Sequence, residues 1–120
     1  MIGEIVIKDF NVLDGLMRGE YPEMLRIMAY EVISQIKKHK VIPVITESFR
    51  EGDSGVHGCY RGLDFRTWEL KSSEIEDILT DINSRFLYDK TRSEMKVLIY
   101  HDVGKGLHLH LQSHPNTVRV

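Results

Sequence analysis

The stretch Lys96-Val-Leu-Ile-Tyr-His-Asp-Val-Gly-Lys-Gly-Leu-His-Leu-His-Leu-Gln112 decides the fold. Two β-prone runs flank a short glycine-rich segment, which is typical of a β-hairpin. Residues two apart on a strand point to the same face of the sheet. We therefore expect His108 and His110 on one face of the second strand. The leucines at positions 107, 109 and 111 take the other face, where helices can cover them.

The rest of the chain predicts helices that would cover this hairpin. Apolar residues recur at helical spacing from Tyr21 to His39, and again from Ser73 to about Phe86, where Ser73-Glu-Ile-Glu76 has the pattern of a capping box. Val41 to Glu47 and Gly62 to Trp68 read as strands, and Glu4 to Lys8 is a weaker strand candidate. The expected fold is α+β, with two helices packed on a small, mainly antiparallel sheet.

Length and composition indicate one domain covering residues 1–120. The chain is 42% hydrophobic and 28% charged, with a formal net charge of -2, so nucleic acid is not an expected partner. The single cysteine, Cys59, excludes an internal disulfide. No apolar run approaches membrane-spanning length and no signal peptide is evident, so we expect no membrane insertion and a protein that is cytoplasmic as synthesised.

Potential metal ligands gather in two places. His57 and Asp64 lie seven residues apart where a loop leads into a strand, and His108-Leu-His110 lies on the return strand of the hairpin. A catalytic zinc ion takes three protein ligands and keeps a fourth position for water, and two histidines with one carboxylate meet that need. Each motif alone is weak, because histidines at alternate strand positions also occur on ordinary exposed faces.

The order of these pieces makes the signal more specific. A strand ending at Arg50 precedes His57 and Asp64, and a helix then leads to the hairpin with His108-Leu-His110. This order, over roughly residues 21 to 113, resembles the zinc peptidase family of D-alanyl-D-alanine carboxypeptidases, D-Ala-D-Ala dipeptidases, phage L-alanyl-D-glutamate endolysins and the hedgehog domain. The resemblance implies a hedgehog/DD-peptidase-like fold and a peptidoglycan peptide as substrate. It also implies a phage or prophage product released to the cell wall.

The resemblance also implies individual roles. His57, Asp64 and His110 resemble the zinc ligands, His108 the histidine that steadies the oxyanion, and Arg50 the arginine that grips a substrate carboxylate. The chain departs from the family's Ser-x-His-x-x-Gly-x-Ala-x-Asp motif at several positions. Most seriously, the acid that family members carry a few residues before the last zinc histidine, as general base, is missing.

Asp102 and His101, on the outgoing strand of the hairpin, are the candidates to replace that base. A loop of two or four residues would pair Asp102 with Leu107 and place His101 opposite His108. A loop of odd length or a bulge would place Asp102 on the histidine face instead. We favour Asp102 with His101 next, although an Asp before a glycine-rich loop is equally typical of a turn.

Three functions remain open from the sequence. The first is a zinc metallopeptidase acting on bacterial cell-wall peptides. The second is a non-catalytic metal-binding module, or a phage structural protein with the same fold. The third is a metal-free interaction domain, which predicts that His57, Asp64 and His110 lie far apart. The oligomeric state does not follow from the sequence.

Overall fold

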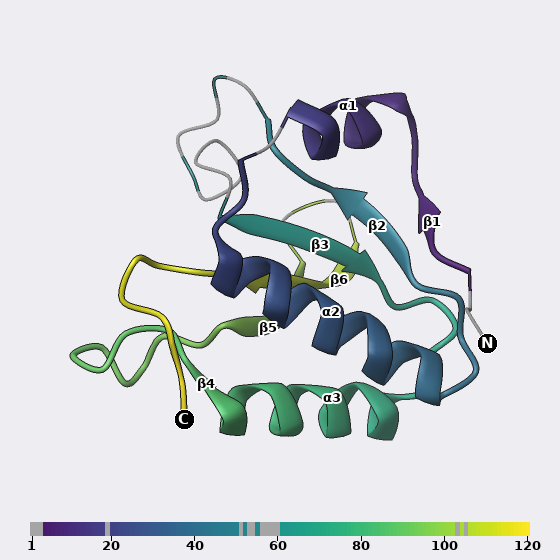
Figure 1. The fold of residues 1–120 in the computed structure, drawn as a ribbon. Helices are drawn as coiled ribbons and strands as arrows, with labels where there is room; N and C mark the ends of the chain where they lie inside the picture. Colours follow the sequence, from purple (N-terminus) through teal and green to yellow (C-terminus); the bar gives the residue numbers. More distant parts are fainter. Residues whose placement is uncertain are drawn as a thin grey trace.

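A computed structural model describes residues 4–18, 20–50, 52, 55, 61–102, 104 and 106–120. Within these residues the chain forms three helices, a five-stranded mixed sheet and a two-stranded sheet (Figure 1). The elements are β1 (Val6–Ile7), α1 (Phe10–Arg18), α2 (Glu23–Lys38), β2 (Val44–Glu47), β3 (Gly62–Arg66), α3 (Ser72–Arg85), β4 (Phe86–Leu87), β5 (Leu98–Asp102), β6 (Leu107–Gln112) and β7 (Val118–Arg119). The α+β class expected from the sequence is confirmed.

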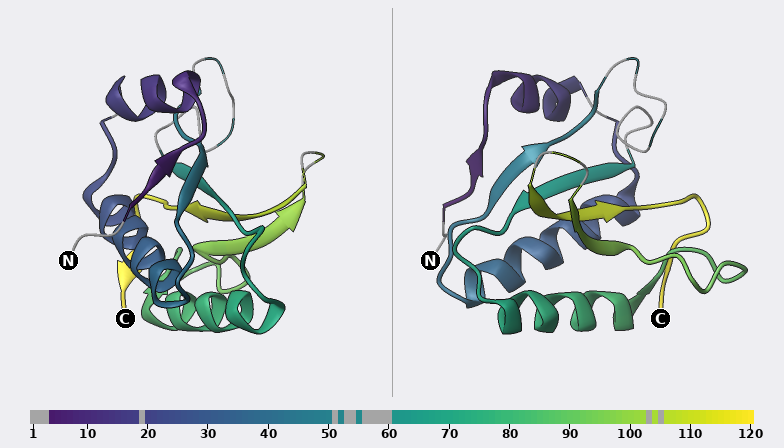
Figure 2. Two further views of the ribbon diagram at one scale, coloured as in Figure 1. Left: turned by 90° about the vertical axis from the view of Figure 1, so that its right-hand side faces the viewer. Right: turned by 180° about the vertical axis from the view of Figure 1, so that it is seen from behind.

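The main sheet has the strand order β1-β2-β3-β6-β5. β1 runs parallel to β2, and every other neighbouring pair in this sheet is antiparallel. In the side view of Figure 2, α2 and α3 lie together on one side of the sheet, and α1 lies at its far end. The hairpin predicted from the sequence is β5–β6, and it supplies two of the three strands on which the polar groups described below are placed.

The helices cover the leucine face of the hairpin. Leu109 and Leu111 on β6 and Phe65 on β3 are fully buried, in one core with the apolar residues of α2 and α3. Complete burial of such a side chain contributes roughly 1.5–3 kcal/mol. The alternation of the hairpin thus assigns Leu109 and Leu111 to the core and leaves its histidines on the opposite face. Leu107, expected to be covered with them, is 51% exposed, because it is the first residue of β6, next to the hairpin loop.

Helix α1 was not predicted, and it packs unusually closely on the end of β2. A Cβ atom on Gly15 would lie 2.3 Å from Ser48 Oγ and 2.5 Å from the carbonyl oxygen of Phe49. Ser48 Oγ donates a hydrogen bond to the carbonyl oxygen of Val12 at 2.7 Å. The Tyr21 hydroxyl donates to the Gly15 carbonyl at 3.3 Å and accepts from the Phe49 amide at 2.9 Å. These contacts fix Ser48 and Phe49, which link the end of β2 to Arg50.

The start of α3 differs from the expected capping box at Ser73. The N-cap is Lys71, and its backbone amide donates to Glu74 Oε1 at 2.8 Å. The prediction is therefore wrong in register, because Glu74 rather than Glu76 stands three residues after the N-cap and can reach back to its amide.

The outer edge of β5 is occupied by a side chain of α3. Asn83 Nδ2 donates to the carbonyl oxygen of Leu98 at 3.0 Å, and the Leu98 amide donates to Asn83 Oδ1 at 3.1 Å. One amide side chain thus makes the pair of hydrogen bonds that a neighbouring strand would make.

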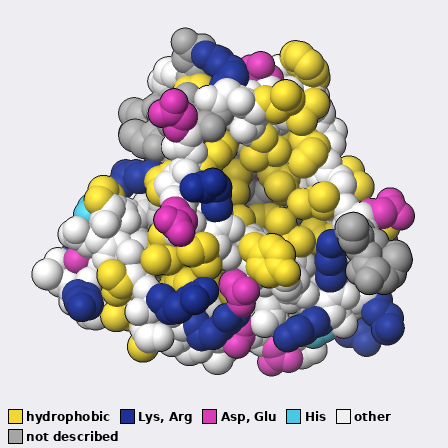
Figure 3. Space-filling view, viewed as in Figure 1, with side chains coloured by type: hydrophobic (Ala, Val, Ile, Leu, Met, Phe, Trp, Pro, Cys, Tyr) yellow, Lys and Arg dark blue, Asp and Glu magenta, His cyan; other side chains and the backbone are white. Residues whose placement is uncertain are grey.

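Several large apolar residues stay exposed on the helical surface, among them Phe10 and Met17 on α1 and Tyr30 on α2. In Figure 3, apolar side chains gather around a hollow between α1 and α2. None of the helices among the described residues combines the length and apolar character needed to cross a membrane.

Candidate metal and acid–base site

The polar face of the sheet brings together residues from three strands. Asp64 on β3 is in register with His110 on β6, and Arg66 on β3 is in register with His108. His108 is also in register with His101 on β5. Residues in register on neighbouring strands point to the same face. The expectation that His108 and His110 share one face, opposite the leucines, is confirmed.

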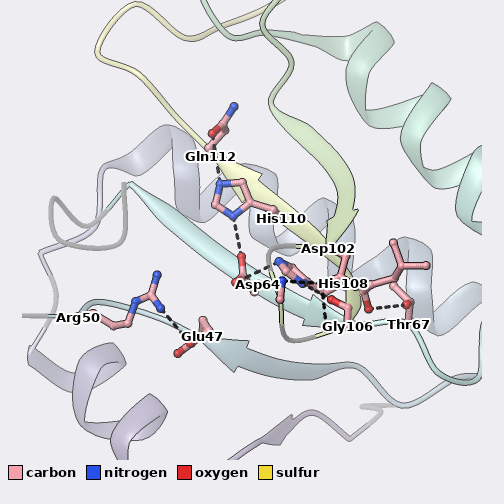
Figure 4. A network of polar contacts seen from close by, with 11 residues as sticks. Glu47, Arg50, Asp64, Thr67, Asp102, Gly106, His108, His110 and Gln112 are labelled. Carbon is pink, nitrogen blue, oxygen red and sulfur yellow. Dashed lines mark hydrogen bonds and ion pairs between the residues drawn. The ribbon is translucent and has the colours of Figure 1, made fainter. Parts of the chain in front are cut away.

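The carboxylate of Asp64 lies between the two histidines of β6 (Figure 4). Its Oδ1 is 2.6 Å from His110 Nδ1, and its Oδ2 is 3.4 Å from His108 Nε2. Asp64 and His110 are only 6% and 7% exposed. A buried carboxylate must be compensated by hydrogen bonds or positive charge, so this arrangement favours a proton or a metal cation between carboxylate and ring.

The second nitrogen of each ring also has a partner. His108 Nδ1 lies 3.1 Å from the carbonyl oxygen of Gly106, and His110 Nε2 lies 3.2 Å from Gln112 Oε1. The amide nitrogen of Gln112 in turn donates to the carbonyl oxygen of Lys96 at 2.8 Å. Both rings are therefore held in orientation from the side away from Asp64, which is how histidines that bind metals are usually supported.

His101 completes the cluster. Its ring centroid is 4.9 Å from that of His108 and 5.2 Å from that of His110. Burial lowers the pKa of His101 below its ordinary value, and the neighbouring His110 and His108 lower this pKa further. A neutral imidazole at pH 7 can accept a proton, so His101 has the protonation state that a general base needs.

Asp102, the base favoured by the sequence, is placed differently. Asp102 is in register with Leu107, and His101 is in register with His108. This is the register expected for a loop of two or four residues, so Asp102 does not share the face of the histidines. Asp102 Oδ1 accepts hydrogen bonds from the amides of Gly104 and Gly106, at 2.7 and 3.1 Å. The carboxylate organises the turn, as the alternative interpretation proposed, and the register favours His101 as the base.

Arg50 lies three residues after the end of β2. Its guanidinium donates to Glu47 Oε2 at 3.2 Å, and Glu47 is in register with Asp64. Both side chains line a cleft of about 520 Å³ between α1 and β2, together with Lys8 and Arg18. The exposed guanidinium is thus placed where a substrate carboxylate could replace Glu47 as its partner.

The donor atoms fit zinc in kind, since zinc binds imidazole nitrogen and carboxylate oxygen. Asp64 and His110 are in contact, whereas the third predicted ligand, His57, lies outside the described residues. Among the side chains that the structure describes, no group of three or more histidine, cysteine or acidic residues has the arrangement of a metal site. The described part of the chain therefore supplies two of the three predicted ligands.

Gln112 is the residue of this site that the sequence interpretation missed. The pattern His108-Leu-His110-Leu-Gln112 carries the signal, because position 112 continues the same alternation and must share the face of the histidines.

Comparison of the chain with protein-family models, with curated proteins and with solved structures finds no match.

Proposed function

We propose that this chain is a zinc-dependent peptidase that hydrolyses peptides of bacterial peptidoglycan. The observation that carries the proposal is the contact of the buried Asp64 carboxylate with ring nitrogens of His108 and His110. The order of Arg50, His57, Asp64 and the hairpin histidines, which resembles the zinc D-Ala-D-Ala peptidases, supports the substrate class.

His57, Asp64 and His110 would hold the metal ion. The chemistry that zinc supplies when bound there is the acidification of water and the polarisation of a carbonyl group. His101 accepts the proton of the attacking water on its neutral ring. His108, oriented by the carbonyl oxygen of Gly106, stabilises the negative charge that develops on the substrate oxygen.

Arg50 binds the substrate from the side of β2. A planar guanidinium suits a carboxylate, and the exposed position of Arg50 lets its ion pair with Glu47 exchange for a substrate group at little cost.

A second function, a metal-binding module without catalysis, is favoured by one observation. The carboxylate of Asp102 is engaged by the amides of Gly104 and Gly106. If Asp102 rather than His101 were required as base, the site would bind metal without supporting hydrolysis.

The first test is the zinc content of the purified protein by mass spectrometry. We expect about one zinc per chain in the wild type, lost in His110→Ala and in Asp64→Asn. His39→Ala is the matched control, because His39 pairs with Glu74 at the end of α2, and it should keep its zinc. Absence of zinc from the wild type after reconstitution would refute the proposal.

The second test is the release of new amino and carboxyl groups from purified peptidoglycan fragments. His101→Gln should keep zinc and lose roughly 10²-fold or more in rate, since a general base contributes about 10²–10⁴-fold. Asp102→Asn should change the rate little. Tight zinc binding with no cleavage of any fragment would favour the non-catalytic module. Unchanged cleavage by His101→Gln would show that the base is another residue.

A further inference from the structure

The side-chain amide of Gln112 has one orientation that satisfies both of its neighbours. One end lies 2.8 Å from the carbonyl oxygen of Lys96, which can only accept a hydrogen bond. The amide nitrogen must therefore face Lys96. Because the amide is planar, its oxygen then faces His110 Nε2, at 3.2 Å. Gln112 is 7% exposed, so water does not readily replace either partner.

This orientation determines which nitrogen of His110 carries hydrogen. The oxygen of Gln112 can only accept, so Nε2 must be the N–H nitrogen. A neutral imidazole has one N–H, and Nδ1 is then left with a lone pair, 2.6 Å from Asp64 Oδ1. Two acceptors at that distance need a cation between them. The contacts of His110 on both sides can be satisfied together only when a proton or a metal ion lies at Nδ1.

We propose that Gln112 is a positioning residue that reserves His110 Nδ1 for a metal ion, which rests on the proposed function. When His110 binds metal through Nδ1, its Nε2–H is buried and needs an acceptor, and Gln112 supplies it. Without Gln112 the Nε2–H of His110 would lack an acceptor in the metal-bound protein, which costs free energy. The metal-free protein avoids this cost, because the hydrogen can move to Nδ1 and bond to Asp64. Loss of Gln112 should therefore weaken metal binding.

The test compares Gln112→Met, which has a similar shape but no acceptor oxygen, with Gln112→Glu, which keeps an oxygen acceptor. Zinc affinity is measured by competition with a chromophoric chelator. We expect Gln112→Met to bind zinc 10–100-fold more weakly than the wild type, the usual effect of removing such a partner. Gln112→Glu should stay within a few-fold of the wild type.

The control variant is Thr117→Val. Thr117 is buried to the same degree; its hydroxyl donates to the carbonyl oxygen of Tyr88 and accepts from the amide of His114, and it has no hydrogen bond to His101, His108 or His110 among the described residues. It should lower stability without changing zinc affinity, which separates a positioning role from a general loss of stability.

The second readout needs no variant. In zinc-loaded wild-type protein, nitrogen-15 NMR should show a slowly exchanging proton on His110 Nε2. A proton on Nδ1 instead, or equal zinc affinity for Gln112→Met and the wild type, would overturn the inference and leave the proposed function standing. Loss of zinc binding in the wild type itself would overturn both.

Discussion

Gly15 offers the sharpest test of how α1 is joined to the sheet. In Gly15→Ala the new methyl group would lie 2.3 Å from Ser48 Oγ and 2.5 Å from the carbonyl oxygen of Phe49. The Ser48 hydroxyl can rotate away, but the backbone carbonyl of Phe49 cannot, so α1 must move outward. That movement also breaks the hydrogen bond from Ser48 to Val12.

The magnitude follows from three contributions. Overpacking of a tight contact costs about 1–3 kcal/mol. The lost hydrogen bond costs about 1 kcal/mol. The higher helix propensity of alanine returns about 1 kcal/mol. We therefore expect Gly15→Ala to lower the free energy of unfolding by about 1–3 kcal/mol, which corresponds to a fall in Tm of roughly 4–12 °C for a domain of this size.

Urea and thermal unfolding, followed by circular dichroism, measure this effect. Asn11→Ala is the matched control, because Asn11 is exposed on the same helix and the change also raises helix propensity. The control should be neutral or slightly stabilising. Gly15→Ala made in a Ser48→Ala background should cost less than in the wild type, since one of the two close contacts is gone. A Gly15→Ala protein as stable as the wild type would refute the close packing of α1 on β2.

Three further predictions concern stability. Hydrogen bonds from the amide and hydroxyl of Thr91 hold the pKa of Asp89 well below its usual range. The contribution of Asp89 to stability is therefore present above about pH 4 and is lost as the pH falls through the pKa of the folded state. The difference in unfolding free energy between wild type and Asp89→Asn, measured by urea unfolding, should be constant from pH 7 to 5 and shrink below pH 4. Asp102→Ala should cost about 1–2 kcal/mol in the same assay, because two loop amides lose their acceptor, and a neutral result would contradict the turn role of this carboxylate. Arg85→Met removes one ion pair from α3 to Glu31 of α2 and one within α3 to Asp81. It should cost less than about 1 kcal/mol, and 1 M NaCl should reduce the difference, since partly exposed pairs are weak and screened by salt.

The faces of β6 were predictable, because burial enforces alternation, whereas the short strands β4 and β7 were not expected at all. Leu109 and Leu111 had to enter the core, so the positions of His108 and His110 followed from the period of two. Asp64 was expected near His110 only through the resemblance to the zinc peptidases, and the two residues are in register and in contact. Whether His57 joins them stays a prediction.

The hairpin register was not predictable from alternation alone. Both registers of the loop satisfy the leucines of β6, and they differ only in whether His101 or Asp102 faces His108. The local bonds of Asp102 to the loop amides decide between them. A side chain whose partners lie within four residues is governed by turn chemistry rather than by the face of the sheet.

Helix α1 escaped prediction because its strongest determinant is a long-range contact. Its nine residues include a central glycine, which lowers intrinsic helix propensity. That glycine is required by Ser48 and Phe49, which are more than thirty residues away in the chain. The reason for the glycine therefore becomes visible only when α1 and β2 are placed together.

The bonds of Asn83 to Leu98 have a consequence for molecules that meet at high concentration. β5 is the last strand of its sheet, and exposed edge strands are where sheets of separate molecules join and begin to aggregate. A side chain that already occupies both backbone groups of Leu98 denies an incoming strand its first pair of hydrogen bonds. Replacing Asn83 by leucine would keep the hydrophobic core but remove the two hydrogen bonds to Leu98. The effect would therefore appear as self-association that increases with protein concentration.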